Sequence, residues 1–194
     1  MFLSPNGVDR AITDAVVDAR TDVVTDIALV VTATGNTLVL TTVVVVVVLG
    51  LVAIRAYPEA VLVGAGSAVG YLAMVGLKHL FGRPRPPTVD RLLDIDTYSF
   101  PSGHAMMSTI VFGLLAAAAF RLSAWVRAHR FVLAIAPIWA IAIGCSRVYL
   151  GVHWTTDVLA GWLIGAAWVA GCVWLCAHWA PMPSRFHASG RLDG

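Results

Sequence analysis

Long apolar runs alternate with short polar segments along most of this chain. The runs predict five membrane-spanning helices: Thr37 to Ile54, about Pro58 to Leu80, about His104 to Leu122, Phe131 to about Val148, and Asp157 to about Trp179. Each run approaches the roughly 20 residues that a helix needs to cross a bilayer. The first contains a valine run that would suit a buried strand in water, but its length and its apolar neighbours favour a membrane helix. The pattern therefore predicts an all-α, polytopic membrane bundle of five to six spans.

Residues 1–36 follow a different pattern. Acidic residues recur there, mostly four positions apart, between apolar ones: Asp9, Asp14, Asp18, Asp22 and Asp26. This spacing is typical of an amphipathic helix. We expect it to lie at the membrane interface, with a tilted first span as the alternative. Residues 37–180 then form the transmembrane bundle, and residues 181–194 form a polar cytoplasmic tail.

The composition agrees with a membrane protein. Hydrophobic residues make up 59% of the chain and charged residues 12%, and the mean hydropathy is +0.82, far above that of a soluble domain. The net charge of +2 is small and the basic residues are not interleaved with exposed aromatics, so we expect no nucleic-acid partner. A transporter or channel would carry polar residues at mid-depth, but these spans are almost purely apolar.

Arginines outside the apolar runs predict the orientation of the bundle. With five spans, one side receives these residues: Arg55, Arg121, Arg127, Arg130, Arg185 and Arg191. The positive-inside rule makes that side cytoplasmic. The polar segments Lys78 to Ser102 and Arg147 to Thr156 then meet on the other face. We therefore expect a multi-pass plasma-membrane protein whose polar loops lie on the extracytoplasmic side.

The first of three polar clusters runs from Lys78 to Pro86, where the second span ends. Its basic residues include Lys78, Arg83 and Arg85. Cations that converge at one place suit a phosphate group, because arginine offers a planar fork of donors and lysine a point charge. The alternative is a basic anchor that reaches up to lipid headgroups.

The second cluster is Pro101 to His104, at the start of the third span. Ser102 is a good N-cap, and Gly103 lets a ligand approach the backbone N–H groups of a helix N-terminus, so an anion site is expected here. His104 lies in the first turn, where it can donate a proton to the bound group. The alternative is a capped helix with an interfacial histidine.

The third cluster, from Ser146 to Asp157, adds the cation Arg147 and the pair His153 and Asp157. Four residues apart on a helix, these two side chains share one face, so the carboxylate can hold the imidazole in one tautomer. The alternative is an intramembrane ion pair that fixes helix packing. Together the three clusters supply cations, helix N-terminal amides, two histidines and a carboxylate, which is the inventory of a phosphoryl-transfer site.

These motifs carry a family resemblance. Lys78 to Pro86 reads K-x6-R-P, Pro101 to His104 reads P-S-G-H, and Ser146 to Asp157 reads S-R-x5-H-x3-D. In that order they resemble the type 2 phosphatidic acid phosphatase (PAP2) superfamily, which includes integral-membrane lipid phosphatases.

The resemblance implies a role for each matching residue. His153 would be the nucleophile that forms a phosphohistidine, Asp157 would orient it, and His104 would be the general acid and then the base. The phosphoryl oxygens would be held by the remaining positions: Lys78, Arg85, Ser102, Gly103 and Arg147. Fixed cations would replace Mg²⁺, so we expect no metal and no other cofactor.

The expected substrate is a phosphate or diphosphate monoester of a lipid: polyprenyl diphosphate, phosphatidylglycerol phosphate or phosphatidic acid. A lipid phosphotransferase or a vanadate-dependent haloperoxidase-like enzyme could use the same site and remains as the alternative. Arg83 lies outside the motif, and we hypothesise that it contacts a second phosphate. The sequence leaves open the role of Trp154 and the oligomeric state.

Overall fold

Helices form the framework of the computed structural model, which describes residues 4–179. Eight α-helices and two short 3₁₀ helices follow in order: α1 (Gly7–Asp18), α2 (Asp22–Thr34), α3 (Thr37–Ala53), α4 (Tyr57–Phe81), η1 (Thr88–Asp90), α5 (Gly103–Leu122), α6 (Ala124–Ala128), η2 (Arg130–Ala134), α7 (Ile135–Tyr149) and α8 (Thr155–Trp179). No strand occurs among these residues. The predicted all-α fold is confirmed. The polar tail predicted for residues 181–194 lies outside the described residues.

The predicted spans correspond closely to the long helices. Four helical stretches in residues 4–179 are long and apolar enough to cross a bilayer: α4, α5, Arg130–Tyr149 and α8. The predicted first span is α3, which has 17 residues. It passes the same test only together with α2, as a pair bent by 43°. The chain is thus an integral membrane protein with four candidate spans, or five if the bent pair counts as one.

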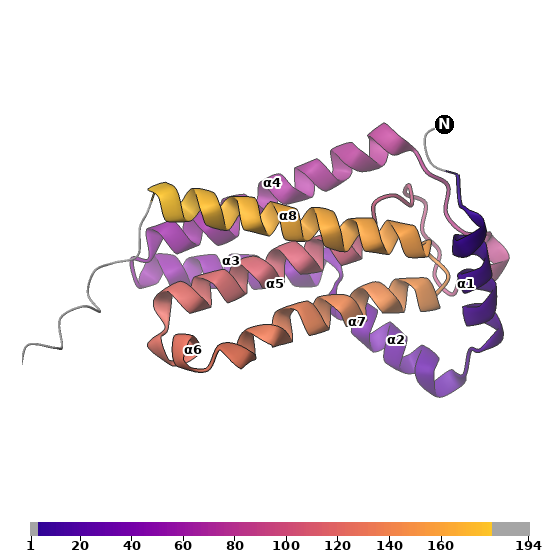
Figure 1. Cartoon of the computed structure of the whole chain (residues 1–194), viewed down its shortest axis with the longest axis horizontal. Coiled ribbons are helices and arrows are strands. Elements are labelled where there is room, and N and C mark those ends of the chain that lie inside the picture. The colour runs from indigo at the N-terminus through magenta and orange to yellow at the C-terminus, as the bar shows by residue number, and fades with distance from the viewer. Residues whose placement is uncertain (1–3, 180–194) are drawn as a thin grey trace, which may run out of the picture.

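The long helices run side by side, while α1 lies across one end of the bundle (Figure 1). In the middle, α5 packs against α4, α7 and α8. Its buried side chains include Met106, Ile110 and Leu114, which form the hydrophobic core with residues of α4 such as Val63. Every polar cluster of the sequence lies at the α1 end, because α4 and α7 finish there and α5 and α8 begin there.

The N-terminal segment forms two helices where the sequence predicts one. Helix α1 ends at Asp18, and Thr21 caps α2 by accepting a hydrogen bond from the backbone N–H of Val24 at 3.4 Å. Between them, the Arg20 guanidinium donates to the carbonyls of Tyr149 and Asp90, at 2.9 and 2.8 Å from Nη2. The break lets α1 cross the end of the bundle while α2 packs on α7.

The valine-rich segment is helical despite its β-branched side chains. Asn36 caps α3 by accepting from the N–H of Leu38 at 3.0 Å. In hydrocarbon, every backbone group needs a partner within the segment, so a helix is favoured over an open strand. The next helix, α4, has Pro58 in its first turn and stops at Gly82, which adopts the left-handed conformation with φ 56°.

Glycines bring α8 close to α5. A Cβ atom added at Gly161 would lie 2.9 Å from the carbonyl oxygen of Ser102 and 3.0 Å from Cβ of Ala105. At Gly165 it would lie 2.9 Å from the carbonyl oxygen of Met106. Small residues at such positions allow the close helix packing of membrane bundles. This contact places the start of α5 against the first turns of α8.

The variant Gly161→Ala should therefore be destabilised, by about 1–3 kcal/mol, because backbone atoms of α5 must shift to admit the methyl group. Thermal unfolding of the detergent-purified protein measures the effect. Gly171→Ala, in the same helix, is the matched control because a Cβ there meets nothing within 4 Å. If the two variants had equal stability, this packing would not be the reason for glycine at position 161.

Candidate active site

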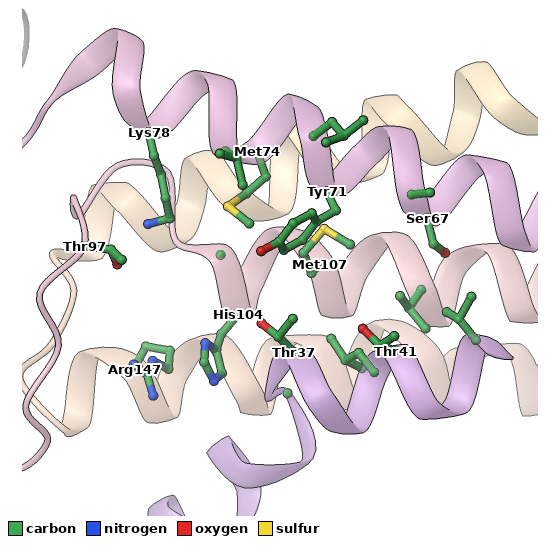
Figure 2. A pocket seen from close by; sticks show the side chains of 18 of the residues that line it. Thr37, Thr41, Ser67, Tyr71, Met74, Lys78, Thr97, His104, Met107 and Arg147 are labelled. Carbon is green, nitrogen blue, oxygen red and sulfur yellow. The ribbon is translucent and has the colours of Figure 1, made fainter. Parts of the chain in front are cut away.

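A cavity of about 1170 Å³ lies between α3, α4 and α5 and ends at the predicted site. Six predicted site residues line that end: Lys78, Arg85, Gly103, His104, Arg147 and His153. Figure 2 shows Lys78 from α4, His104 from α5 and Arg147 from α7 at one end of the cavity. Helix ends that are far apart in sequence thus bring the three polar clusters together.

His153 lies in the turn between α7 and α8 and is 2% exposed. Its Nε2 is 3.1 Å from Nη1 of Arg85, and its Nδ1 is 3.5 Å from Oδ2 of Asp157. A guanidinium only donates, so Nε2 must accept and the ring proton must be on Nδ1, facing the carboxylate. The nitrogen on the side of Arg85, away from Asp157, is therefore the one that carries the lone pair.

The surroundings of His153 keep this imidazole neutral. Burial lowers the pKa of His153 well below its usual value, and the positive charges of Arg85, Arg147 and Lys78 lower it further, with a contribution from His104. A neutral imidazole retains the lone pair that a nucleophile needs. The same cations that suit a phosphate thus also hold His153 in its reactive form.

Asp157 lies behind His153 and is fully buried. Its Oδ2 accepts from the hydroxyl of Ser99 at 2.5 Å and from the backbone N–H of Trp154 at 3.0 Å. Its Oδ1 accepts from Arg83. These donors fix the carboxylate in one orientation, so it can hold the imidazole as the sequence predicts.

Each cation at the cavity end is held by a backbone or side-chain partner. Nζ of Lys78 donates to the carbonyl of Tyr98 at 2.6 Å, and Nη1 of Arg147 donates to Oγ1 of Thr32 at 2.7 Å. Nη1 of Arg85 donates to the carbonyl of Val152 at 2.5 Å. Burial lowers the pKa of Arg85 to about 10, with Arg91 adding to the effect, so the guanidinium is still charged at neutral pH.

The start of α5 differs in one respect from the prediction. Ser102 occupies the N-cap position, but its side chain makes no capping hydrogen bond, and its Oγ is buried without a partner in the described structure. Its backbone N–H donates to the carbonyl of Asp157 at 3.1 Å, so α5 is tied to the first turn of α8. Gly103 and His104 follow in the first turn of α5 and line the cavity as predicted.

Arg83 does not have the role that the sequence hypothesis gave it. It is 3% exposed, and its two terminal nitrogens donate to the carboxylates of Asp9 and Asp157. It also does not line the cavity. The hypothesis that Arg83 contacts a second phosphate is therefore wrong, because its donors face the opposite side of Asp157.

The sequence leaves the role of Trp154 open, and the structure gives this side chain a partner. The indole Nε1 of Trp154 donates to the carbonyl of Pro84 at 3.0 Å, so this side chain, 5% exposed, ties the turn that carries His153 to the first motif. Among residues 4–179, no group of three or more histidines, cysteines or acidic residues could hold a metal ion.

Apolar residues line the rest of the cavity, away from the charged end. They come from α3, α4 and α5 and include Val44, Val48, Leu72, Met74 and Met107. Hydroxyl groups of Thr37, Thr41, Ser67 and Tyr71 lie along this wall (Figure 2). The lining side chains of Val45 and Leu49 from α3 and of Leu72 from α4 are also exposed, so the cavity reaches the apolar outer surface between these two helices.

Comparison with known families decides the classification. The family model for the PAP2 superfamily matches residues 59–181, which is more than half of the chain. The chain belongs to the PAP2 superfamily. The family that the three motifs indicated is therefore confirmed.

Two curated relatives of the chain are phosphatases by name. Phosphatidylglycerophosphatase B of Bacillus subtilis (strain 168) is 39% identical over 90 residues, 46% of this chain and 44% of that protein. Undecaprenyl-diphosphatase of Sulfolobus acidocaldarius is 43% identical over 74 residues, 38% of this chain and 31% of that protein. These matches thus span less than half the length of either curated relative.

Solved structures give a longer match. The transmembrane PAP2-type phosphatidylglycerolphosphate phosphatase of Bacillus subtilis superposes with a TM-score of 0.85 at 28% identity, over 91% of this chain and 88% of that one. LpxE of Aquifex aeolicus gives a TM-score of 0.72 at 21% identity, over 89% of this chain and 99% of that one, which is a likeness of fold. The structural likeness therefore extends beyond the family match into the N-terminal third of the chain.

Proposed function

We propose that this PAP2 protein is a lipid phosphatase that hydrolyses a phosphate or diphosphate monoester through a phosphohistidine intermediate. The observation that carries the proposal is one continuous cavity. Its charged end holds three cations, Lys78, Arg85 and Arg147, with His104 and His153, and its other end is apolar and reaches the lipid-facing surface. A phosphorylated headgroup fits the first part and an alkyl chain fits the second. The membrane phosphatases among the relatives support the same class of substrate.

In the first step, Nε2 of His153 attacks the phosphorus atom and the bond from phosphorus to the lipid oxygen breaks. His104 donates a proton to the leaving oxygen, so the lipid leaves as an alcohol (or a monophosphate from a diphosphate). Lys78, Arg85 and Arg147 stabilise the charge on the phosphoryl oxygens in the transition state. Nη1 of Arg85 lies 3.1 Å from Nε2 of His153, so this donor must turn to the phosphate when Nε2 attacks.

In the second step, water attacks the phosphohistidine and the phosphorus–nitrogen bond breaks. His104, now neutral, takes a proton from that water and inorganic phosphate is released. Throughout, the carboxylate of Asp157 holds the Nδ1 proton and balances the positive charge that the phosphorylated ring carries. Arg83, Ser99 and the Trp154 N–H all donate to this carboxylate and hold it in place behind the ring.

The orientation follows from charge. Four arginines lie at the end of the bundle opposite the site: Arg55, Arg121, Arg127 and Arg130. Under the positive-inside rule that end is cytoplasmic, so the site would face the outside of the plasma membrane. Hydrolysis of a membrane-impermeant short-chain substrate by intact cells would report this side, and hydrolysis only after permeabilisation would contradict it.

Detergent-purified protein should release phosphate in excess EDTA from at least one of three lipids: polyprenyl diphosphate, phosphatidylglycerol phosphate or phosphatidic acid. We expect EDTA to change the rate less than about twofold, because fixed cations supply the charge that a metal ion would otherwise provide. The rank order of the three rates assigns the substrate. Folded protein that releases phosphate from none of them would refute the proposal.

A further inference from the structure

An acidic residue of the N-terminal helix is joined to the catalytic centre. Asp9, in the first turn of α1, is fully buried, unlike the exposed Asp14 and Asp18 of the same helix. Its Oδ2 accepts from Nη2 of Arg83 at 2.7 Å. The other terminal nitrogen of Arg83 donates to Oδ1 of Asp157. One guanidinium thus bridges a carboxylate of α1 and the carboxylate that orients His153.

A second set of bonds holds Asp9 against the start of α8. The backbone N–H of Thr156 donates to Oδ1 of Asp9 at 3.0 Å, and the Thr156 hydroxyl lies 2.8 Å from Oδ2. Burial raises the pKa of Asp9, but the hydrogen bonds from Thr156 and Arg83 outweigh it and leave the pKa below its usual value. Asp9 is therefore a charged carboxylate in a buried place, where an unpaired charge would be costly.

The charge count explains why a second carboxylate matters. If Arg83 paired with Asp157 alone, the two charges would cancel next to His153. With Asp9 present, the three side chains together keep one negative charge. That charge is what Asp157 uses to balance the positive ring of a phosphorylated histidine. The shared guanidinium also fixes the carboxylate plane of Asp157, since Arg83 itself is held from both sides.

We propose that Asp9 is a positioning residue of the active site, acting through Arg83 to hold Asp157 oriented and negatively charged behind His153. The inference rests on the proposed phosphatase function and extends the site to α1, a helix outside the family match. It makes α1 part of the catalytic machinery in addition to any contact it has with the membrane surface.

The direct test is Asp9→Asn, which keeps the shape of the side chain and removes its charge. We expect kcat to fall about tenfold with KM changed less than twofold, because Asp9 touches neither the cavity nor the substrate. Asp18→Asn, an exposed acid on the same helix, is the matched control and should leave both constants unchanged. A kcat for Asp9→Asn within twofold of the wild type would overturn the proposal.

A double-mutant cycle separates this role from simple docking of α1. In an Arg83→Met background, Asp9→Asn should lower kcat no further, and should raise the thermal stability, because asparagine avoids a buried carboxylate without a partner. An equal fall of kcat in both backgrounds would mean that Asp9 acts through helix docking and would overturn the proposal.

A third variant covers the case in which Arg83→Met does not fold. Thr156→Val removes the hydroxyl that contacts Oδ2 of Asp9 and Nη1 of Arg83, each at 2.8 Å, but it keeps the backbone N–H bond to Asp9 and both ion pairs of Arg83. It should therefore lower stability while lowering kcat less than Asp9→Asn does. If Thr156→Val lowered kcat as much as Asp9→Asn or more, Asp9 would act by docking α1 against α8 and not through Arg83. If the wild-type protein releases no phosphate, the proposed function itself is refuted. If the wild type is active and Asp9→Asn is equally active, only the role of Asp9 is refuted.

Discussion

Replacing His153 with alanine should abolish phosphate release from the lipid substrate, with a fall in kcat of about 10⁴-fold or more. Nε2 of His153 carries its lone pair at the charged end of the cavity, and within residues 4–179 no other histidine that lines the cavity pairs with a carboxylate. Without the imidazole, water would have to attack the phosphorus directly. The remaining cations would still bind the phosphate, so KM should change much less than kcat.

Phosphate release and trapping of the intermediate both measure this loss. Substrate with a labelled phosphate, mixed with the wild type and quenched in alkali, should leave label on the protein, since phosphohistidine survives alkali. His153→Ala should take up no label. His129→Ala, a histidine at the opposite end of the bundle, is the control and should behave as wild type. Full labelling of His153→Ala would assign the nucleophile to another residue.

Replacing His104 with alanine should give an effect that depends on the leaving group. For a lipid substrate, the leaving alkoxide needs a proton, and we expect a loss of about 10²–10⁴-fold in the first turnover. For p-nitrophenyl phosphate, whose leaving group is a stable anion, the first turnover should fall less than tenfold. Water activation in the second step still needs His104, so the steady-state rate with this substrate should fall as well.

Rapid mixing of His104→Ala with p-nitrophenyl phosphate should therefore show a burst of p-nitrophenolate followed by slow turnover. His79→Ala is the control, because His79 also lines the cavity but occupies a variable position of the first motif. A first turnover that is slowed equally for the two substrates would contradict the role of His104 as the general acid. It would instead place His104 among the groups that only bind the phosphate.

The sequence predicted the assembly of the site because each motif lies at a helix end. Lys78 finishes one span and His104 begins the next, so alternation of direction puts both on the same side of the bundle. The same argument applies to Arg147 and His153 across the turn between α7 and α8. Helix length and polarity therefore determined which residues meet, without knowledge of any contact.

Residues outside the motifs escaped prediction for physical reasons. Asp9 has the same spacing as the other acidic residues of its segment, and only its burial against Arg83 and Thr156 distinguishes it. Ser99, which donates to Asp157, lies in a loop where sequence periodicity has no meaning. In the sequence, nothing distinguishes Arg83 from the neighbouring basic residues. Its pairing depends on two carboxylates that are distant in the chain.

The fold was predicted to within a few residues at each span, but the N-terminal segment was not. Apolar runs determine where a helix can cross a bilayer, so the bounds of α4, α5 and α8 follow from composition alone. The break between α1 and α2 depends instead on Arg20, whose partners Tyr149 and Asp90 are supplied by other parts of the chain. Such tertiary hydrogen bonds leave no local pattern to read.

The gap between α3 and α4, where exposed Val45, Leu49 and Leu72 also line the cavity, has a kinetic consequence. A ligand that arrives through this gap diffuses in the plane of the bilayer or the micelle. Its effective concentration is then its mole fraction among the surrounding amphiphiles, and not its amount per litre. Adding inert detergent at constant substrate should slow the reaction by surface dilution, while diluting substrate and detergent together should leave the rate per enzyme nearly constant.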